Sequence, residues 1–422
     1  MSTRFEAADR AEWQSGWRIV VGVGIGMGTG IALYLMVSSL FVTRITDEFG
    51  WSRGDLSLAA AVGYIAGALS LAVIGRLLDR HGYRRVVLVC VPGLALVYLG
   101  AASIKGSFTI YVLLMVVAGI FGTGTGALSY TRPLIAAFDR QRGLALGVAA
   151  SGISVTAIAM PPLLAYVIGA HGWRAGFIAM AIITLGIGLP LALWFIGRVK
   201  NERRVDTETL TLSELPEASE AERRAPSIPL RQAMRGKQFW LLVVALVAIN
   251  IPGSGIVGQL APLLSDQGLS DTATGLALSV YALGLMAGRL ITGFALDRVP
   301  VARVAALMTG VPAIGALILL VPEPHVAVAL VAVALIGLQQ GSELDLLAYF
   351  ISRNFGFGHY SSIFGAIATA GALSTASGIV LFGQVHDATG AYTIALMVGA
   401  FAFLVGAVAF YATSRVARPL PG

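Results

Sequence analysis

Charged residues are scarce in this chain, and their scarcity limits where its surface can lie. Asp, Glu, Lys and Arg make up 12% of the 422 residues, whereas hydrophobic residues make up 57% and the mean hydropathy is +0.82. Soluble globular domains carry about 25% charged residues. A chain with so few charges cannot cover a folded surface with them, so most of that surface must face lipid. The composition therefore excludes an ordinary water-soluble domain.

Cysteine is nearly absent, and histidine is sparse. Cys90 is the only cysteine, so the chain can form neither an intramolecular disulfide nor a cysteine metal site. We expect no metal and no cofactor. Because the short loops hold no catalytic cluster and no nucleotide-binding motif, we expect neither an enzyme nor a primary transporter. Four histidines stand in loops or at the ends of apolar runs, without metal-ligand spacing: His171, His325, His359 and His386.

Most basic residues lie in the segments that would face one side of a membrane. A formal net charge of +7 and a pI near 9.7 can indicate nucleic-acid binding in a soluble protein. Here most Lys and Arg fall in the N-terminus, in alternate loops and in the C-terminus. This asymmetry follows the positive-inside rule and predicts cytoplasmic termini. We therefore expect a multi-pass protein of a bacterial inner membrane that contacts the lipid bilayer and no nucleic acid. The residues on the opposite side are Arg44, Arg53, Lys105 and Arg174.

Long apolar runs follow one another along the chain. A spanning helix needs roughly 20 apolar residues, and we predict twelve such helices, hence an all-α membrane protein. The polar stretch 198–237 is predicted to be a cytoplasmic linker between two six-helix bundles, 1–197 and 238–422. The predicted spans are 17–43, 56–78, 84–104, 108–137, 143–170, 174–197, 238–265, 272–296, 302–322, 326–352, 360–386 and 391–414.

The two predicted bundles share a motif. The sequence GRLLDR at 75–80 recurs as GFALDR at 293–298, each time where an apolar run meets a basic loop. Repetition over half a chain indicates duplication of a structural unit. Parallel repeats of this kind are typical of membrane transporters, in which two similar bundles rock about a site near the bilayer midplane.

Glycine and proline occur inside the predicted spans. Glycines in 22–30 and 122–126 are expected to let helices approach closely, because neither a strand nor a soluble helix flanks them as a phosphate-binding loop would require. The segment 250–255 is the most polar break and is expected to line a cavity. Prolines are expected to interrupt helices and to supply hinges: Pro161, Pro162, Pro190, Pro252 and Pro312.

Few charged residues fall inside a predicted span, and the cost of a charge in lipid makes each one a candidate functional residue. The clear cations are Arg132 and Arg289, and the acidic residues are Glu343 and Asp345. Counted from the charged ends of their helices, these side chains lie about 12–15 Å from the cytoplasmic surface, close to the midplane. Their helices belong to both bundles, as expected for a site between repeats.

Arg289 is predicted to bind a carboxylate. A guanidinium stays charged at physiological pH and can form two parallel hydrogen bonds to a carboxylate, so a lone arginine suits a monoanion. A buried ion pair with Glu343 or Asp345 is the structural alternative. Arg132 is either a second anion contact or a side chain that reaches the cytoplasmic interface.

Glu343 and Asp345 cannot both face the same point, because residues two apart on a helix lie about 200° apart. One of them is predicted to line the cavity and carry a proton, since a low-dielectric site favours the neutral carboxyl. Either residue fits that role, and a structural carboxyl is the alternative. Other polar residues either line the cavity or pack between helices: Tyr34, Tyr130, Asn250, Gln259 and Tyr281.

The stretch GRLLDRHGYRR at 75–85 resembles the signature loop between helices 2 and 3 of the major facilitator superfamily, in which Gly, Asp-Arg, Gly and a closing arginine pair have fixed spacing. The resemblance covers essentially the whole chain through the twelve-span layout. It implies that this loop closes the cytoplasmic side, with Asp79 bonded to the start of a neighbouring helix in the outward-open state. The residues that receive this gating role are Gly75, Asp79, Arg80, Arg84, Asp297 and Arg298.

Within the superfamily, the chain is most similar to bacterial members of the monocarboxylate-porter and oxalate/formate-antiporter branch. The sequence GSELDLLAY at 341–349 resembles helix 10 of that group. Arg289 matches the helix 8 arginine that binds the substrate carboxylate in this branch. The chain departs from animal members at Leu35, where they have lysine, and at Leu285, where they have aspartate. Residues 360–385 lack the helix 11 lysine of the oxalate antiporter.

Together these patterns predict a secondary transporter that moves a small organic acid anion, a monocarboxylate, with a proton by rocking of the two bundles. The alternatives are an exchanger of organic anions and an exporter of hydrophobic compounds with the same fold. The resemblance also implies a monomer.

Overall fold

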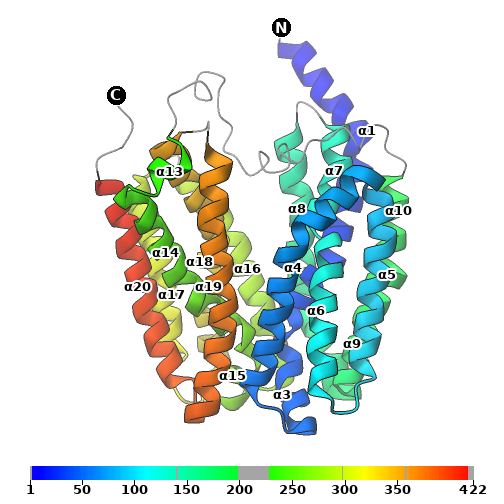
Figure 1. The fold of residues 1–422 in the computed structure, drawn as a ribbon, viewed down its shortest axis with the longest axis vertical. Coiled ribbons are helices and arrows are strands. Elements are labelled where there is room, and N and C mark those ends of the chain that lie inside the picture. Colours follow the sequence, from blue (N-terminus) through cyan, green and yellow to red (C-terminus); the bar gives the residue numbers. More distant parts are fainter. Residues whose placement is uncertain (1, 139–140, 198–227, 297, 357–358, 417–422) are drawn as a thin grey trace. The chain divides into compact units, whose positions relative to one another are not determined.

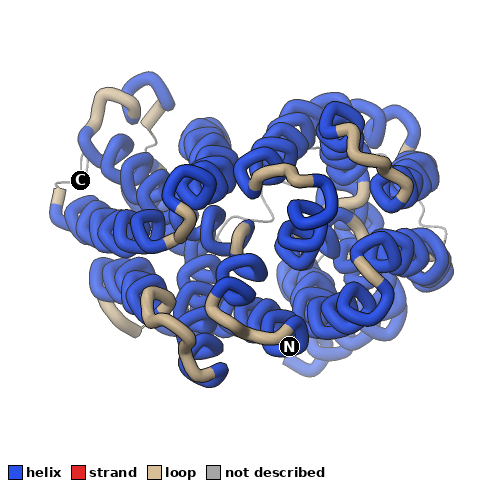
Figure 2. The backbone as a smooth tube through the Cα atoms, turned by 90° about the horizontal axis from the view of Figure 1, so that it is seen from below, coloured by secondary structure: helices blue, strands red, loops and turns tan. Residues whose placement is uncertain are grey.

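The computed structural model describes residues 2–138, 141–197, 228–296, 298–356 and 359–416. Within these ranges the chain is helical and has no strand (Figures 1 and 2). Eleven spans in the described part are long and apolar enough to cross a membrane, and the bent pair α1–α2 makes a twelfth. The prediction of an all-α membrane bundle is therefore confirmed. The predicted linker 198–237 lies mostly outside the described residues.

The chain divides into two compact units. They depart from the two predicted bundles at residues 50–61, which belong to the second unit. Unit 1 comprises Met1–Phe49 and Val62–Ser213, and unit 2 comprises Gly50–Ala61 and Glu214–Gly422. Helix α4 (Arg53–His81) thus begins in unit 2 and continues in unit 1. The other helices of unit 1 are α1 (Ser2–Thr29), α2 (Ile31–Val37), α3 (Ser39–Phe49), α5 (Tyr83–Ala102), α6 (Phe108–Gly124), α7 (Ala127–Ala137), α8 (Arg142–His171), α9 (Trp173–Ala181), the π-helix η1 (Ile182–Gly188) and α10 (Leu189–Ile196).

Unit 2 holds the helices on which the acidic membrane residues lie. Its α16 and α18 pack closely, as do α14 with α19 and α17 with α20. A short helix, α13, precedes the first spanning helix of this unit. The bounds are α13 (Leu230–Ala233), α14 (Lys237–Gly258), α15 (Leu260–Asp266), α16 (Asp271–Leu296), α17 (Val301–Ile318), α18 (Val326–Phe355), α19 (Tyr360–Thr389) and α20 (Thr393–Arg415).

The first span, predicted as one helix over 17–43, is bent in the structure. Helix α1 ends at Thr29 and α2 begins at Ile31, with an angle of 47° between them. A Cβ atom at Gly30 would collide with the carbonyl oxygen of Thr125. The freed backbone groups find partners, because the Ile31 N–H donates to Thr125 Oγ1 (3.0 Å) and Thr184 Oγ1 donates to the Thr29 carbonyl (2.8 Å). Satisfied backbone groups are what permit a break at membrane depth.

Glycines on α16 and α18 bring these two helices into backbone contact. A Cβ atom at Gly288 would collide with the carbonyl oxygen of Leu338, and one at Gly341 would collide with that of Leu285. Small residues four apart allow this approach in membranes. The contact places Arg289, which follows Gly288, beside the segment of α18 that carries Glu343.

Several prolines lie inside continuous helices, which differs from the predicted interruptions. Helix α8 runs through Pro161 and Pro162, α14 through Pro252, and α17 through Pro312. In membrane helices neighbouring groups can satisfy the backbone that a proline frees. The segment 250–255 is therefore helical, and its polar side chains point from a helix rather than from an open break.

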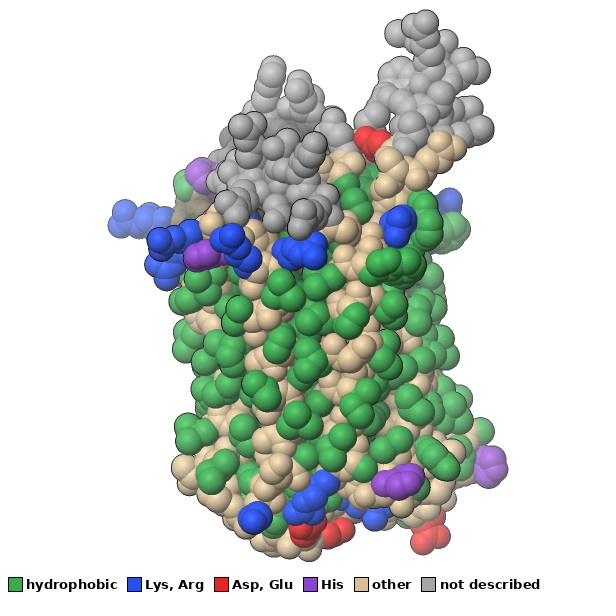
Figure 3. Space-filling model, turned by 90° about the vertical axis from the view of Figure 1, so that its right-hand side faces the viewer, with side chains coloured by type: hydrophobic (Ala, Val, Ile, Leu, Met, Phe, Trp, Pro, Cys, Tyr) green, Lys and Arg blue, Asp and Glu red, His purple; other side chains and the backbone are tan. Residues whose placement is uncertain are grey.

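The exposed side chains of the spans are mainly apolar. On the face shown in Figure 3, hydrophobic side chains cover the middle and charged ones gather at the two ends. Leu69 is 75% exposed, and Leu96 on α5 is 66% exposed. Exposing so many apolar side chains to water would cost free energy, whereas lipid tails accommodate them.

Candidate functional site

Glu343 is a buried carboxyl that amide groups surround. It lies on α18 with 6% of its surface exposed. The Asn250 Nδ2 atom of α14 donates to Glu343 Oε1 at 2.8 Å, and Gln340 Nε2, one turn earlier on α18, donates to Oε2 at 3.1 Å. Each oxygen of the carboxyl thus accepts one amide N–H. Buried carboxyl groups require such partners, because an unpaired charge in a low-dielectric interior is expensive.

Neighbouring helices hold this cluster in place. Thr375 Oγ1 on α19 donates to Asn250 Oδ1 at 3.4 Å. Tyr281 on α16 is 4% exposed and lies close enough to Glu343 for an electrostatic interaction. The sequence singled out Asn250, Tyr281 and Glu343, but not Gln340 or Thr375. The spacing of Gln340 before Glu343 puts both on one helix face and was visible in the sequence, whereas nothing in the sequence marks Thr375.

Arg289 is exposed on α16 and faces away from the apolar stripe of that helix. Within the described part of the chain it has no hydrogen bond and no ion pair, and its interaction with Asp345 is electrostatic only. At 3.6 residues per turn, Arg289 lies about 120° around the helix from the stripe. It shares a sector instead with Leu278 and Ala282, which are buried. The exposed apolar stripe is made of Leu276, Leu283, Leu290 and Phe294.

Asp345 differs from Glu343 in its surroundings. It is partly exposed, and Arg289 is the charge that acts on it. The two acidic residues therefore face different neighbours, as their spacing on α18 predicts. Unit 2 thus contains an exposed guanidinium with a partly exposed carboxylate nearby, and a separate buried carboxyl that amide groups hold.

Arg132 lies in unit 1 and is fully buried on α7. Its Nη2 atom lies 2.6 Å from Asp79 Oδ1 on α4, whose side chain is 50% exposed. The Nε and Nη1 atoms of Arg132 have no hydrogen-bond partner among the described residues. One carboxylate therefore neutralises a guanidinium that no water reaches, and this ion pair joins α7 to the end of α4.

The remaining predicted gating residues are dispersed. Gly75 has open space where a side chain would begin, and Arg80 is exposed. Arg84 Nη1 donates to the Gly197 carbonyl at 3.3 Å. Arg298 Nη1 donates to the Phe294 carbonyl, in the last turn of α16, at 3.1 Å. Asp297 lies outside the described residues.

The predicted tyrosines also fall in different places. In unit 1, the Tyr34 hydroxyl donates to Met115 Sδ at 3.2 Å, and Tyr130 is buried against Gly26 of α1. Of the three predicted tyrosines, Tyr281 is the one that lies beside Glu343. The structure therefore brings together Asn250, Tyr281 and Glu343, while Tyr34 and Tyr130 pack within the other unit.

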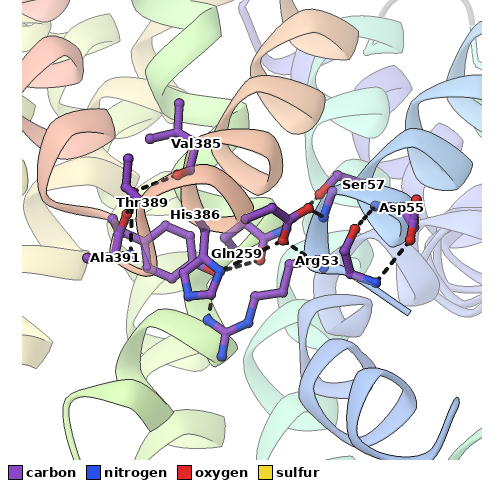
Figure 4. Close-up of polar contacts among 12 residues, drawn as sticks. Arg53, Asp55, Ser57, Gln259, Val385, His386, Thr389 and Ala391 are labelled. Carbon is purple, nitrogen blue, oxygen red and sulfur yellow. Dashed lines mark hydrogen bonds and ion pairs between the residues drawn. The ribbon is translucent and has the colours of Figure 1, made fainter. Parts of the chain in front are cut away.

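A second polar cluster surrounds Arg53 at the start of α4 and was missed from the sequence (Figure 4). Its guanidinium contacts both carboxylate oxygens of Asp266, at 2.5 and 2.7 Å, and the Tyr392 hydroxyl at 2.9 Å. Asp387 of α19 accepts from the backbone N–H groups of Arg53 (3.1 Å) and Gly54 (2.8 Å). Only the tertiary structure brings these distant residues together.

Amide and imidazole groups extend the Arg53 cluster. Gln259 Nε2 donates to Ser57 Oγ at 2.7 Å, and its Oε1 accepts from the Tyr392 hydroxyl at 2.8 Å. His386 Nε2 lies 3.5 Å from Asp266 Oδ2. Gln259, which the sequence proposed for the cavity wall, is thus part of this cluster. The cluster fixes the first turn of α4 to α15, α19 and the loop before α20.

A bundle of apolar spanning helices with a duplicated sequence motif is typical of a membrane transporter. The profile of the Major Facilitator Superfamily matches residues 23–379. The chain therefore belongs to this superfamily, and it is a transporter and not an enzyme.

Related proteins and structures agree with this assignment. Monocarboxylate transporter 13 of Bos taurus is 24% identical over 401 residues, covering 93% of this chain and 87% of the relative. A probable sulfoacetate transporter of Cupriavidus necator is 27% identical over 390 residues, covering 86% of each. The crystal structure of a bacterial homolog of the human lysosomal transporter Spinster shares the fold, with a TM-score of 0.72, 15% identity and coverage of 96% and 97%. These results confirm the predicted superfamily and are consistent with its monocarboxylate branch.

Proposed function

We propose that this protein moves a small organic monocarboxylate together with a proton by alternating access. The observation that carries the proposal is the state of Arg289, an arginine within a spanning helix that is exposed, unpaired in the described residues and turned away from the apolar stripe. A charge at that depth is retained when it serves a function. A bidentate carboxylate would neutralise it.

The proton would be carried by Glu343 rather than Asp345. Glu343 is buried, and among the described residues it has no cationic partner, so neutral amides hold its charged form. A proton would remove that charge altogether. Asp345 is partly exposed and lies near enough to Arg289 for a favourable charge interaction, although the two, both among the described residues, form no ion pair. For Arg132, full burial and the ion pair with Asp79 favour a role in joining α7 to α4 over direct contact with the anion.

Relatives support the substrate class. A monocarboxylate transporter and a probable transporter of sulfoacetate, a small organic acid, are both similar to this chain over most of its length. A single free guanidinium fits one carboxylate. The proposed substrate is therefore a small organic acid anion.

Uptake of labelled monocarboxylates into proteoliposomes tests the proposal. An inward proton gradient should drive accumulation by the wild type, and Arg289→Ala should abolish it. Glu343→Gln should lose accumulation driven by the gradient but retain exchange of labelled for unlabelled substrate, because a permanently neutral side chain has no proton to release. Asp345→Asn is the matched control and should keep the dependence on the gradient.

Two outcomes would contradict the proposal. Wild-type levels of uptake by Arg289→Ala would remove the anion anchor. Uptake by the wild type that needs internal substrate and ignores pH would instead indicate an organic-anion exchanger.

A further inference from the structure

The two oxygens of Glu343 are held by amides that differ in freedom. Asn250 is 5% exposed, and both ends of its amide are engaged, Nδ2 by Glu343 and Oδ1 by Thr375. Gln340 is partly exposed, and its single side-chain hydrogen bond among the described residues runs from Nε2 to Glu343. One amide is thus fixed, whereas the other is tethered at one end.

The present arrangement suits an ionised Glu343. A carboxylate accepts hydrogen bonds at both oxygens, whereas a protonated carboxyl also donates one. The new O–H would gain an acceptor if one of the two donating amides rotated and presented its oxygen, and a buried hydroxyl without an acceptor costs about 1–3 kcal/mol.

Room for this rotation exists at Gln340. Its Oε1 faces Gly253 of α14, where a Cβ atom would lie 3.2 Å away. Because Gly253 has no side chain, the amide can turn against a smooth helix surface. Rotation of Asn250, in contrast, would break its contacts with both Glu343 and Thr375.

We propose that Gln340 is the positioning residue that follows the protonation state of Glu343: the proton binds at Oε2, and the Gln340 amide rotates so that its Oε1 accepts the new O–H. The hydrogen bond from Gln340 Nε2 to Glu343 Oε2 breaks in this step, and no covalent bond other than the new O–H forms or breaks. The inference rests on the proposed proton-carrying role of Glu343. It assigns the proton to one oxygen and separates a mobile amide, Gln340, from a fixed one, Asn250.

Gln339 is the competing amide beside Glu343, because it is fully buried and neither of its side-chain amide atoms has a hydrogen-bond partner among the described residues. Gln339→Met should therefore leave the amide shift in place if Gln340 is the residue that rotates.

Tyr281 faces Glu343 from α16, Asn250 from α14 and Gln339 from its own helix. Residues 360–385 of α19 contain no charged side chain, and α14 contains only Lys237, at its first residue. Arg289 acts on Asp345, on a different sector of α18.

Infrared difference spectra of the purified protein between alkaline and acid pH test the proposal. In the wild type, the band of a protonated carboxyl should appear together with a shift of one side-chain amide band. Glu343→Gln should remove the carboxyl band. Gln340→Met, which keeps the length of the side chain, should remove the amide shift and retain the carboxyl band. Asn250→Leu should retain both signals.

A second variant keeps the amide but restricts its rotation. Gly253→Ala should weaken the amide shift, because the new methyl group would lie 3.2 Å from the present position of Gln340 Oε1 and leave the amide less space to turn. Thermal unfolding of each variant checks that it folds.

The outcomes distinguish this inference from the proposed function. An amide shift that survives Gln340→Met and disappears in Asn250→Leu would overturn the assignment of the mobile amide. A wild-type spectrum with the carboxyl band but no amide shift would overturn the rotation. Absence of gradient-driven uptake, with both spectroscopic signals intact, would contradict proton-coupled transport and leave the amide switch standing.

Discussion

Arg289 and Glu343 lie on neighbouring spanning helices and have opposite surroundings. Glycine contacts bring their helices together, yet Glu343 is enclosed by amides while Arg289 is exposed and unpaired in the described part of the chain. A buried charge is stable only with partners, whereas an exposed charge at mid-depth needs water or a ligand. These opposite surroundings are why we assign the proton to one residue and the anion to the other.

At the same scale, we expect the Asp79–Arg132 ion pair to stabilise unit 1. In Asp79→Asn the fully buried guanidinium would lose its charged partner, which should lower the free energy of unfolding by about 2 kcal/mol after allowance for the half-exposed carboxylate. Thermal unfolding in detergent measures this loss. The double variant Asp79→Asn with Arg132→Met should recover part of it. Unchanged stability together with tighter substrate binding would instead make Arg132 an anion contact.

At the scale of elements, the close contact between α16 and α18 depends on glycines, which have no side chain. Gly341→Ala would place a methyl group against the carbonyl of Leu285 and the backbone of Arg289. We expect α18 to shift from α16, with a loss of about 1–3 kcal/mol and reduced uptake. Gly365→Ala is the matched control on α19, because nothing lies within 4 Å of its added Cβ. Equal melting temperatures for both variants would contradict the packing argument.

The Arg53 cluster makes a prediction for the start of α4. Arg53 is 13% exposed and holds Asp266, so Arg53→Gln should leave acidic residues without their cation. We expect a loss of about 2 kcal/mol in the free energy of unfolding and faster hydrogen exchange in the first turn of α4. Lys105→Gln, at an exposed loop position, should change neither quantity. If exchange in α4 stays slow in Arg53→Gln, the remaining backbone contacts of Asp387 suffice to hold the helix.

For the whole molecule, the charge distribution predicts sidedness. Cys90 is buried, so Cys90→Ala provides a background without reactive thiols. In that background Lys105→Cys should react with a membrane-impermeant maleimide in intact cells, whereas Arg303→Cys should react only after the membrane is opened. Both positions are exposed. The reverse labelling pattern would place the termini outside.

How the chain divides into units is also a property of the whole molecule that sequence symmetry did not reveal. The repeated motif pointed to two bundles, 1–197 and 238–422, but residues 50–61 group with unit 2. The reason is local chemistry, because Arg53 finds its partners on α15, α19 and the loop before α20, and Ser57 finds its partner in Gln259, between α14 and α15. Opposite charges far apart in a sequence carry no sign of their pairing.

The amino-acid sequence by itself determined the membrane environment, the helical class and the superfamily, because these follow from hydrophobic run length, charge asymmetry and a motif with fixed spacing. It also selected Arg289, Glu343 and Asp345, since charges inside apolar runs are rare and costly. Tertiary structure alone decided which carboxyl is buried, which cation is free and which amides meet Glu343. Those properties depend on contacts between helices, such as that of Asn250 with α18, and no local pattern encodes a distance between side chains on separate helices.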